Sequence, residues 1–194
     1  MANLFAKLGF EAFRAGIQPR SEESRKWFRK RVQDMRSINR DSLLKDESLE
    51  KGNTNLVGSM NMFFYDPKTK DTLPFYDTFP LVIIVGPAQG GFYGINLHYL
   101  PMNLRAKFLD GLLDNLNNKR YDESTRFKIN YNMLRRASKL KYFKPCFKHY
   151  LTEHVSGRIS RVPSSEWEIA TFLPTANFEK GSNETVYRFS RSMI

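Results

Sequence analysis

The chain has 194 residues, and its 31 Lys and Arg against 20 Asp and Glu give a formal net charge of +11 at pH 7. With 16 Phe and 9 Tyr it can bury a sizeable core, which excludes wholesale disorder. The excess of positive charge favours a polyanionic partner, which can be nucleic acid, an anionic membrane or an acidic protein.

The first helix is predicted over residues 2–15. One side of it carries the apolar residues Leu4, Phe5, Leu8 and Ala12. We expect this side to dock onto the protein itself or onto a neighbour. A membrane is not the expected partner, because the polar face is not densely basic and no apolar run reaches the roughly 18 residues of a membrane helix.

A second helix can begin after Ser21, which is a suitable N-cap. Its apolar stripe is made of Phe28, Val32 and Met35. Residues 45–56 are polar and typical of a linker. We therefore predict a helical extension over residues 1–50 and a core domain over residues 51–194.

The core region contains both strand and helix patterns. Strands are expected near residues 60–67, 79–87, 91–100 and 157–163. Helices are expected over residues 102–116, as a pair separated at Pro145 between residues 127 and 155, and over 164–174 with a cap at Ser164 or Ser165. The tail after Phe178 is expected to be extended. This order predicts an α+β fold with a small, strongly bent antiparallel sheet, which could close into an SH3-like barrel, surrounded by helices.

The stretch GPAQGGFYG, residues 86–94, has the glycines of a phosphate loop. No Lys-Ser/Thr pair follows them, and the stretch continues into a strand where a nucleotide-binding loop would begin a helix. It is therefore predicted to be a hairpin turn, and neither a cofactor nor a small-molecule substrate is expected. In the strand that follows, alternation predicts a buried face with Tyr93, Ile95, Leu97 and Tyr99 and a polar face with Gly94, Asn96 and His98.

A zinc site is not expected. Cys146, His149 and His154 are too few and too scattered, since structural zinc usually has four ligands in two close pairs. A lone cysteine also excludes an internal disulfide and fits a reducing environment. We interpret Cys146 as a buried, inert thiol.

A metal-dependent nuclease is an alternative that the acidic residues raise. Asp66, Asp71 and Asp77 could bind magnesium if they converged. They lie beside prolines and aromatic residues in a predicted turn, however, and Asp66 before Pro67 is ordinary turn chemistry. The prediction is therefore that the protein is not an enzyme.

The distribution of charge is the most specific signal. Residues 124–152 contain no acidic residue and eight positive ones, which are Arg126, Lys128, Arg135, Arg136, Lys139, Lys141, Lys144 and Lys148. A solvated helix face normally mixes signs, because opposite charges four residues apart stabilise it. A segment whose charges are all positive therefore predicts binding to a phosphate backbone that is sensitive to salt and independent of base sequence. The second helix adds Arg29 and Lys30 to these candidates, and an acidic protein is the alternative partner.

Several segments together resemble one family. They are WFRKRV, FFYDPKTKDTLPFYDTFPLVI, GGFYGINLHYLP with LRAKFLD, YFKPCFKHYL and EWEIATFLP, and they span roughly residues 25–178. Their combination is similar to the DNA end protector proteins of T4-like tailed phages. The resemblance implies a minor virion protein that sits with the end of the packaged genome near the portal, enters the host cytoplasm with the DNA and blocks host exonucleases.

The leading hypothesis is therefore a phage virion protein that binds double-stranded DNA at or near its end through helical Lys and Arg side chains. Protection would be steric, because the bulk of the protein denies a nuclease its entry point. The alternative is a purely structural neck, tail or baseplate component, in which the basic faces contact acidic virion proteins.

Overall fold

Helices and strands are interspersed along the chain in the computed structural model, which describes residues 3–35, 37–53, 57–117, 120, 123–137 and 139–193. The helices are α1 (Leu4–Arg14), α2 (Glu22–Arg31), α3 (Arg40–Leu44), α4 (Met102–Asn117), α5 (Glu123–Ala137), α6 (Trp167–Phe172) and α7 (Asn183–Ser192). The strands are β1 (Glu50–Lys51), β2 (Met60–Tyr65), β3 (Tyr76–Asp77), β4 (Leu81–Ala88), β5 (Gly91–Asn96), β6 (Phe147–Leu151), β7 (Val155–Val162) and β8 (Phe178–Glu179). The predicted α+β class is confirmed.

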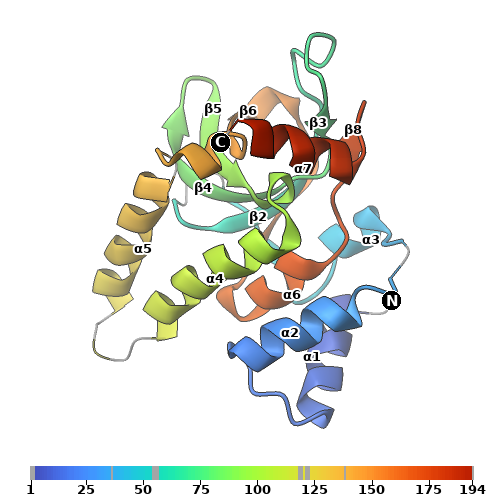
Figure 1. Ribbon diagram of the computed structural model, residues 1–194, viewed down its shortest axis with the longest axis vertical. Helices are drawn as coiled ribbons and strands as arrows, with labels where there is room; N and C mark the ends of the chain where they lie inside the picture. Colours follow the sequence, from blue (N-terminus) through green and yellow to red (C-terminus); the bar gives the residue numbers. More distant parts are fainter. Residues whose placement is uncertain are drawn as a thin grey trace.

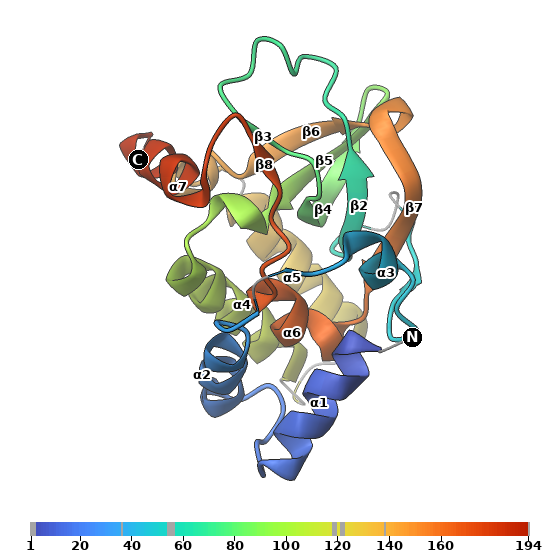
Figure 2. The ribbon, with the colours of Figure 1, turned by 90° about the vertical axis from the view of Figure 1, so that its right-hand side faces the viewer.

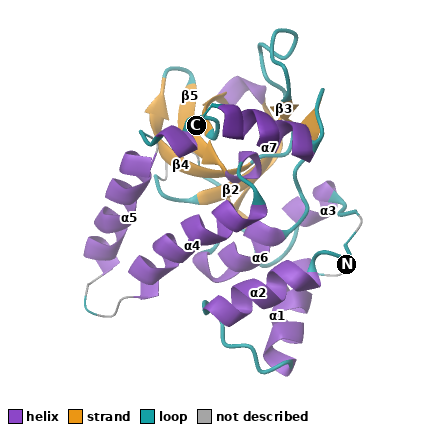
Figure 3. Cartoon of the chain, in the orientation of Figure 1, coloured by secondary structure: helices purple, strands orange, loops and turns teal. Residues whose placement is uncertain are grey.

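Six strands of the described chain form one sheet in the order β1-β7-β2-β4-β5-β6, and β3 pairs separately with β8. Each of these pairs is antiparallel. The register shifts once in β2 and once in β4, and such bulges bend a sheet. Because β1 and β6 are edges, the sheet is open and does not close into the SH3-like barrel. Figure 3 shows the strands in one half of the molecule and most helices in the other.

The stretch GPAQGGFYG is the predicted hairpin. β4 and β5 pair as far as Ala88 and Gly91, which leaves Gln89 and Gly90 as the turn. Gly90 has a φ of 72°, a backbone conformation that favours glycine. A β-carbon on Gly91 would overlap the carbonyl oxygen of Tyr150 in β6. These glycines therefore shape the sheet.

One apolar cluster joins the helices to a face of the sheet. It includes Phe5, Leu8 and Ala12 of α1, Phe28 of α2, Leu109 and Leu112 of α4, and Met60, Ile83 and Ile95 of the sheet. The buried side of α1 is the one predicted from its sequence. A second cluster contains Phe63, Tyr65, Val82, Ile84, Phe92 and Tyr150. The division of the chain at residue 50 stays a prediction.

Capping explains where several helices begin. Ser21 accepts a hydrogen bond from the Ser24 backbone N–H, which confirms the predicted cap of α2. Asn39 caps α3 in the same way, so the chain after α2 contains a separate short helix. Ser164 and Ser165 lie in a 3₁₀ turn before α6, and the cap predicted there is wrong, because no side chain caps this helix.

Residues 147–151 form the edge strand β6, and the helix predicted after Pro145 is wrong. β6 pairs along most of β5, with Gly91 opposite Leu151. Five residues are too few to separate a strand pattern from a helical one. The strand forms because β5, which is distant in sequence, offers residues 147–151 an edge with which to pair.

Two polar segments also contain structure that their composition does not show. Part of the linker predicted over residues 45–56 is strand β1, and Leu49 beside it is buried; residues 54–56 lie outside the described part of the chain. The C-terminal tail, predicted to be extended, contains α7, which is capped by Ser182 and buries Val186. In both segments a few apolar contacts outweigh a polar composition.

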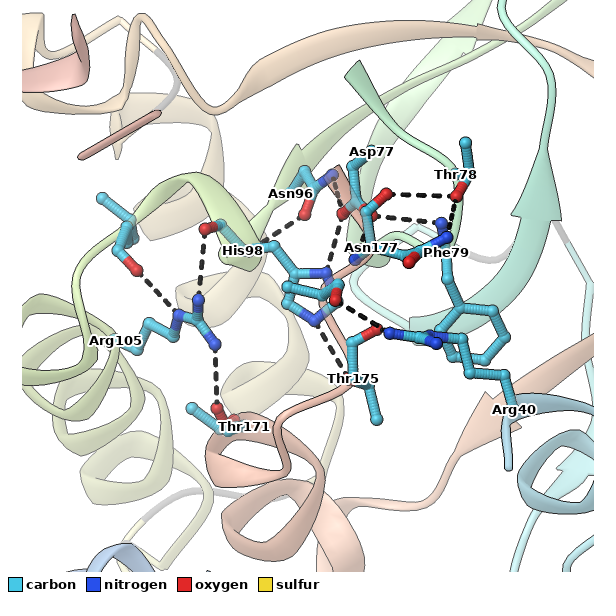
Figure 4. A network of polar contacts seen from close by, with 12 residues as sticks. Arg40, Asp77, Thr78, Phe79, Asn96, His98, Arg105, Thr171, Thr175 and Asn177 are labelled. Carbon is cyan, nitrogen blue, oxygen red and sulfur yellow. Dashed lines mark hydrogen bonds and ion pairs between the residues drawn. The ribbon is translucent and has the colours of Figure 1, made fainter. Parts of the chain in front are cut away.

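Asn96 and His98, predicted on a polar face, are completely buried. The strand ends at Asn96 and continues as a 3₁₀ turn, so the alternation of β5 stops before His98. Figure 4 shows what these residues contact. His98 Nδ1 lies 2.7 Å from Asp77 Oδ2, and His98 Nε2 lies 3.1 Å from Thr175 Oγ1. Asn96 Nδ2 donates to both Asp77 Oδ2 and the Tyr150 hydroxyl.

Two arginines extend this buried network (Figure 4). Arg105 of α4 is 3% exposed and donates to the carbonyl oxygens of Leu100 and His98 and to the Tyr187 hydroxyl of α7. Arg40 of α3 donates to two carbonyl oxygens just before β8. The network therefore ties α3, α4 and α7 to the ends of the strands.

Burial sets the charge states of the central pair. Burial lowers the pKa of His98 in spite of the attraction of Asp77, so the neutral imidazole is favoured. Burial also opposes ionisation of Asp77, but His98 and the hydrogen bonds from Asn96 and the Phe79 N–H outweigh it and hold the pKa of Asp77 below its usual value.

A histidine with a lowered pKa makes stability depend on pH. The unfolded chain takes up the His98 proton at a higher pH than the folded chain, so stability falls as pH drops below about 6.5. We expect His98→Gln to be less stable than the wild type at pH 7. Between pH 7 and 5 its free energy of unfolding should also depend less on pH, with a slope smaller than that of the wild type by up to about 1.4 kcal/mol per pH unit.

Urea unfolding of the wild type, His98→Gln and the control His149→Gln at pH 5, 6 and 7 measures this slope. His149 is exposed and lies outside the buried network, so its variant controls for the replacement of a histidine by glutamine. Equal slopes for the wild type and His98→Gln would contradict the assignment.

Candidate nucleic-acid interface

Five of the predicted cations lie at the end of α5 and in the connection from α5 to β6, and all five are exposed. We call them the cationic connection, and they are Arg135, Arg136, Lys139, Lys141 and Lys144. Among the described residues, no carboxylate pairs with Lys139, Lys141 or Lys144. Their charges are therefore available to a phosphate backbone.

The cationic connection is held by apolar contacts with the core. Leu134 and Ala137 on α5 are buried, and Phe143 packs against Phe108 of α4 with ring centres 4.8 Å apart. Beside these contacts, a groove of about 560 Å³ runs between α4 and α5 and is lined mainly by apolar side chains, including the exposed Leu140. The end of α5 and the ring of Phe143 are therefore packed on the core next to the exposed charges.

Four further predicted residues on α5 and α2 are not part of the cationic connection. Arg126 and Lys128 are in α5, but their side chains lie outside the described part of the structure. Arg29 and Lys30 are exposed at the end of α2, next to Arg31, whose Nε donates to Glu11 Oε2 at 2.7 Å. Figure 1 shows α4 between α2 and α5. The two basic segments are therefore separate.

Lys148 differs from the cationic connection, although it follows directly in sequence. It is half-buried on β6, and its Nζ lies 4.1 Å from the centre of the Tyr99 ring. Burial lowers the pKa of Lys148. The sequence showed the charge of Lys148 but not its surroundings, because Tyr99 is brought to it by the pairing of β6 with β5.

The acidic residues of the nuclease alternative have separate environments. Asp66 pairs with Lys70 at 2.9 Å on the surface, Asp71 is exposed, and Asp77 is buried in the network around His98. Within the described part of the chain, no three His, Cys, Asp or Glu side chains are placed to hold a metal ion.

The residues considered for zinc are also separately engaged. Cys146 is completely buried, as predicted, and burial raises the pKa of its thiol to about 12. His149 Nε2 contacts the Gln89 carbonyl oxygen at 3.0 Å, and His154 Nδ1 contacts the Asp66 carbonyl oxygen at 2.8 Å. As for membranes, the helices of the described residues are all too short or too polar to cross a bilayer.

Comparison with known families decides the affiliation of the chain. The family model described as "Phage T4 terminal DNA protecting protein" matches residues 11–192. The chain belongs to this family. The match includes the sheet, the cationic connection and Lys148, and it confirms the resemblance found in the sequence. The family is named for protection of DNA ends and not for a reaction. No curated protein and no solved structure matches the chain.

Proposed function

We propose that this phage protein binds double-stranded DNA non-specifically at or near the end of the packaged genome and shields that end from host exonucleases. The observation that carries the proposal is the cationic connection, in a chain whose family is named for protecting DNA ends. As a component of the virion, the protein would enter the host cytoplasm with the DNA.

The proposed mechanism is electrostatic and steric. Lysine and arginine side chains that neutralise phosphates release counterions, which gives affinity without reading the base sequence. The cationic connection lies at the β6 edge of the sheet, and the helices around it add bulk next to the bound DNA. A nuclease that must thread the free end would then be blocked without any reaction by the protector.

We expect DNA affinity to depend steeply on salt and on the cationic connection. The triple variant Lys139→Gln, Lys141→Gln, Lys144→Gln should bind linear duplex more weakly, and the slope of log affinity against log salt should fall by about 2 to 3, because each phosphate contact contributes about 0.9. Fluorescence anisotropy measures the affinity and its salt slope, at salt concentrations from about 50 to 200 mM, where a large loss of DNA affinity is expected.

A matched control removes the same charge elsewhere. Lys45, Lys51 and Arg158 are exposed, and Lys51 lies in the opposite edge strand of the sheet. Replacing these three by Gln should leave most of the slope unchanged. An equal loss in both triple variants would show that net charge, and not the cationic connection, holds the DNA.

We also expect end protection to follow binding. Linear duplex saturated with wild-type protein should resist a processive double-strand exonuclease, whereas the Lys139, Lys141 and Lys144 triple variant at the same concentration should protect it poorly. The assay compares the length of end-labelled DNA over time. Full digestion at saturating protein would refute the proposal, and digestion by the protein with magnesium alone would favour the nuclease alternative.

A second function is favoured by the outer side of α1. Phe10 is 60% exposed and Phe13 is 78% exposed, although the opposite side of the helix is buried in the core. Exposed aromatic side chains on neighbouring turns are typical of a protein contact. We therefore propose that α1 contacts another virion protein near the portal, neck or tail, in addition to DNA binding by the cationic connection.

The α1 contact is tested by Phe10→Ser, Phe13→Ser. We expect this variant to be incorporated into virions at a level reduced several-fold, with unchanged affinity for linear duplex. Phe189→Ser is the control, because Phe189 is 44% exposed on α7. Normal incorporation of the α1 variant would exclude this contact.

A further inference from the structure

A pocket of about 330 Å³ opens between β6 and the loop of residues 66–75 that joins β2 to β3. Figure 2 shows this loop rising beyond the sheet next to β6. Lys148 and Tyr99 line the pocket together with Asn96 and Tyr150 of the buried network, and Lys68 comes from the loop. This volume is at the lower end of the range for small-ligand pockets, about 300–1,000 Å³.

Among the residues that the structure describes, the ammonium group in this pocket has no anionic partner. Lys148 Nζ contacts the Tyr99 ring, and no carboxylate or carbonyl oxygen of the described residues accepts a hydrogen bond from it. A half-buried ammonium has lost part of its hydration, and an aromatic ring replaces only part of that interaction. An anion entering the pocket would therefore gain a strong contact.

Two tyrosine hydroxyl groups add unused donors. The Tyr65 hydroxyl accepts a hydrogen bond from the Leu151 N–H, and the Tyr150 hydroxyl accepts one from Asn96 Nδ2. Within the described chain, nothing accepts the proton of either hydroxyl. Asp77 is the one carboxylate among the described residues that line the pocket, and both of its oxygen atoms already accept hydrogen bonds from the network. The pocket thus offers donors in excess of acceptors.

The loop over the pocket is held in place before any ligand arrives. Lys180, just after β8, donates from Nζ to the carbonyl oxygens of Lys70 and Asp71 at 2.6 and 3.2 Å. Lys70 in turn pairs with Asp66 at the start of the loop. A preformed wall lowers the entropy that binding would otherwise lose.

We propose that this pocket binds the terminal phosphate of a DNA strand, with Lys148 Nζ and the hydroxyl groups of Tyr65 and Tyr150 as its donors. The inference rests on the proposed function and specifies what would distinguish an end from internal duplex. A terminal phosphate carries more charge and one more free oxygen than a phosphodiester. It also projects from the duplex, whereas an internal phosphate has strand on both sides and cannot enter a walled pocket.

The test uses a duplex closed by a hairpin at one side, so that each molecule has one free end. The free end carries a 5′-phosphate, a 3′-phosphate or only hydroxyl groups, and a closed circular duplex measures binding without ends. We expect wild-type protein to bind one of the phosphorylated ends about ten-fold more tightly than the hydroxyl end. Inorganic phosphate, compared with chloride at equal ionic strength, should reduce this preference.

Variants assign the preference to the pocket. Lys148→Met and Tyr150→Phe should abolish the preference and leave affinity for the circular duplex unchanged. Lys144→Met in the cationic connection is the matched control, and it should weaken binding to every DNA by a similar factor. Circular dichroism and urea unfolding identify a variant that has lost its fold. In that case Tyr65→Phe, which removes another proposed donor of the pocket, measures whether the preference for a phosphorylated end is lost.

The outcomes separate this inference from the proposed function. Equal binding of phosphorylated and hydroxyl ends by the wild type overturns the terminal-phosphate pocket, while salt-dependent binding and end protection still support the proposed function. A preference that survives Lys148→Met and both tyrosine variants also overturns it. Competition by inorganic phosphate alone, with equal binding of all ends, would show a free-anion site and overturn it as well.

Discussion

The burial of Asp77, His98 and Arg105 is the constraint on which the rest of the structure depends. A buried ionised group without partners destabilises a fold by several kcal/mol, on the order of 3–5. Here the partners come from β5, α6 and the segment before β8 (Figure 4), and also from α7, so the fold must bring all of these together at one point. The same network places Asn96 and Tyr150 at the pocket beside Lys148, which connects the stability of the core to the shape of a surface site.

Lys144 and Lys148 belong to one basic segment of the sequence but have different environments in the fold. Lys144 is exposed, keeps its hydration, and can follow a phosphate backbone with little geometric demand. Lys148 is half-buried against Tyr99, so it gains from an anion only in a defined position. A sequence that reads as one run of cations therefore folds into an exposed cationic surface followed by a half-buried lysine that lines a pocket, because only the second part of the run is a strand.

The sequence predicted those parts of the fold whose signals are local. The turn at Gly90, the cap at Ser21 and the helix after Pro101 depend on neighbouring residues, and all three are confirmed. Residues 147–151 form a strand because they pair with the edge of β5, and His98 is buried because a 3₁₀ turn interrupts the alternation of β5. Neither the strand nor the burial of His98 could be predicted from the neighbouring residues in the sequence. The candidate site divides likewise: charge located the cationic connection, whereas the pocket around Lys148 joins residues from three distant segments.

The buried network also shows why geometry alone does not define an active site. Asp77, His98 and Thr175 lie in hydrogen-bond order, as an orienting acid, a base and a hydroxyl nucleophile would. Thr175 and His98 are completely buried and Asp77 is 4% exposed, so no substrate atom can reach the hydroxyl without unfolding the core. The arrangement therefore stabilises the strand ends. Under the proposed function, the groups that would face a DNA strand are the exposed cations and the residues that line the pocket, and these would hold phosphate without breaking a bond.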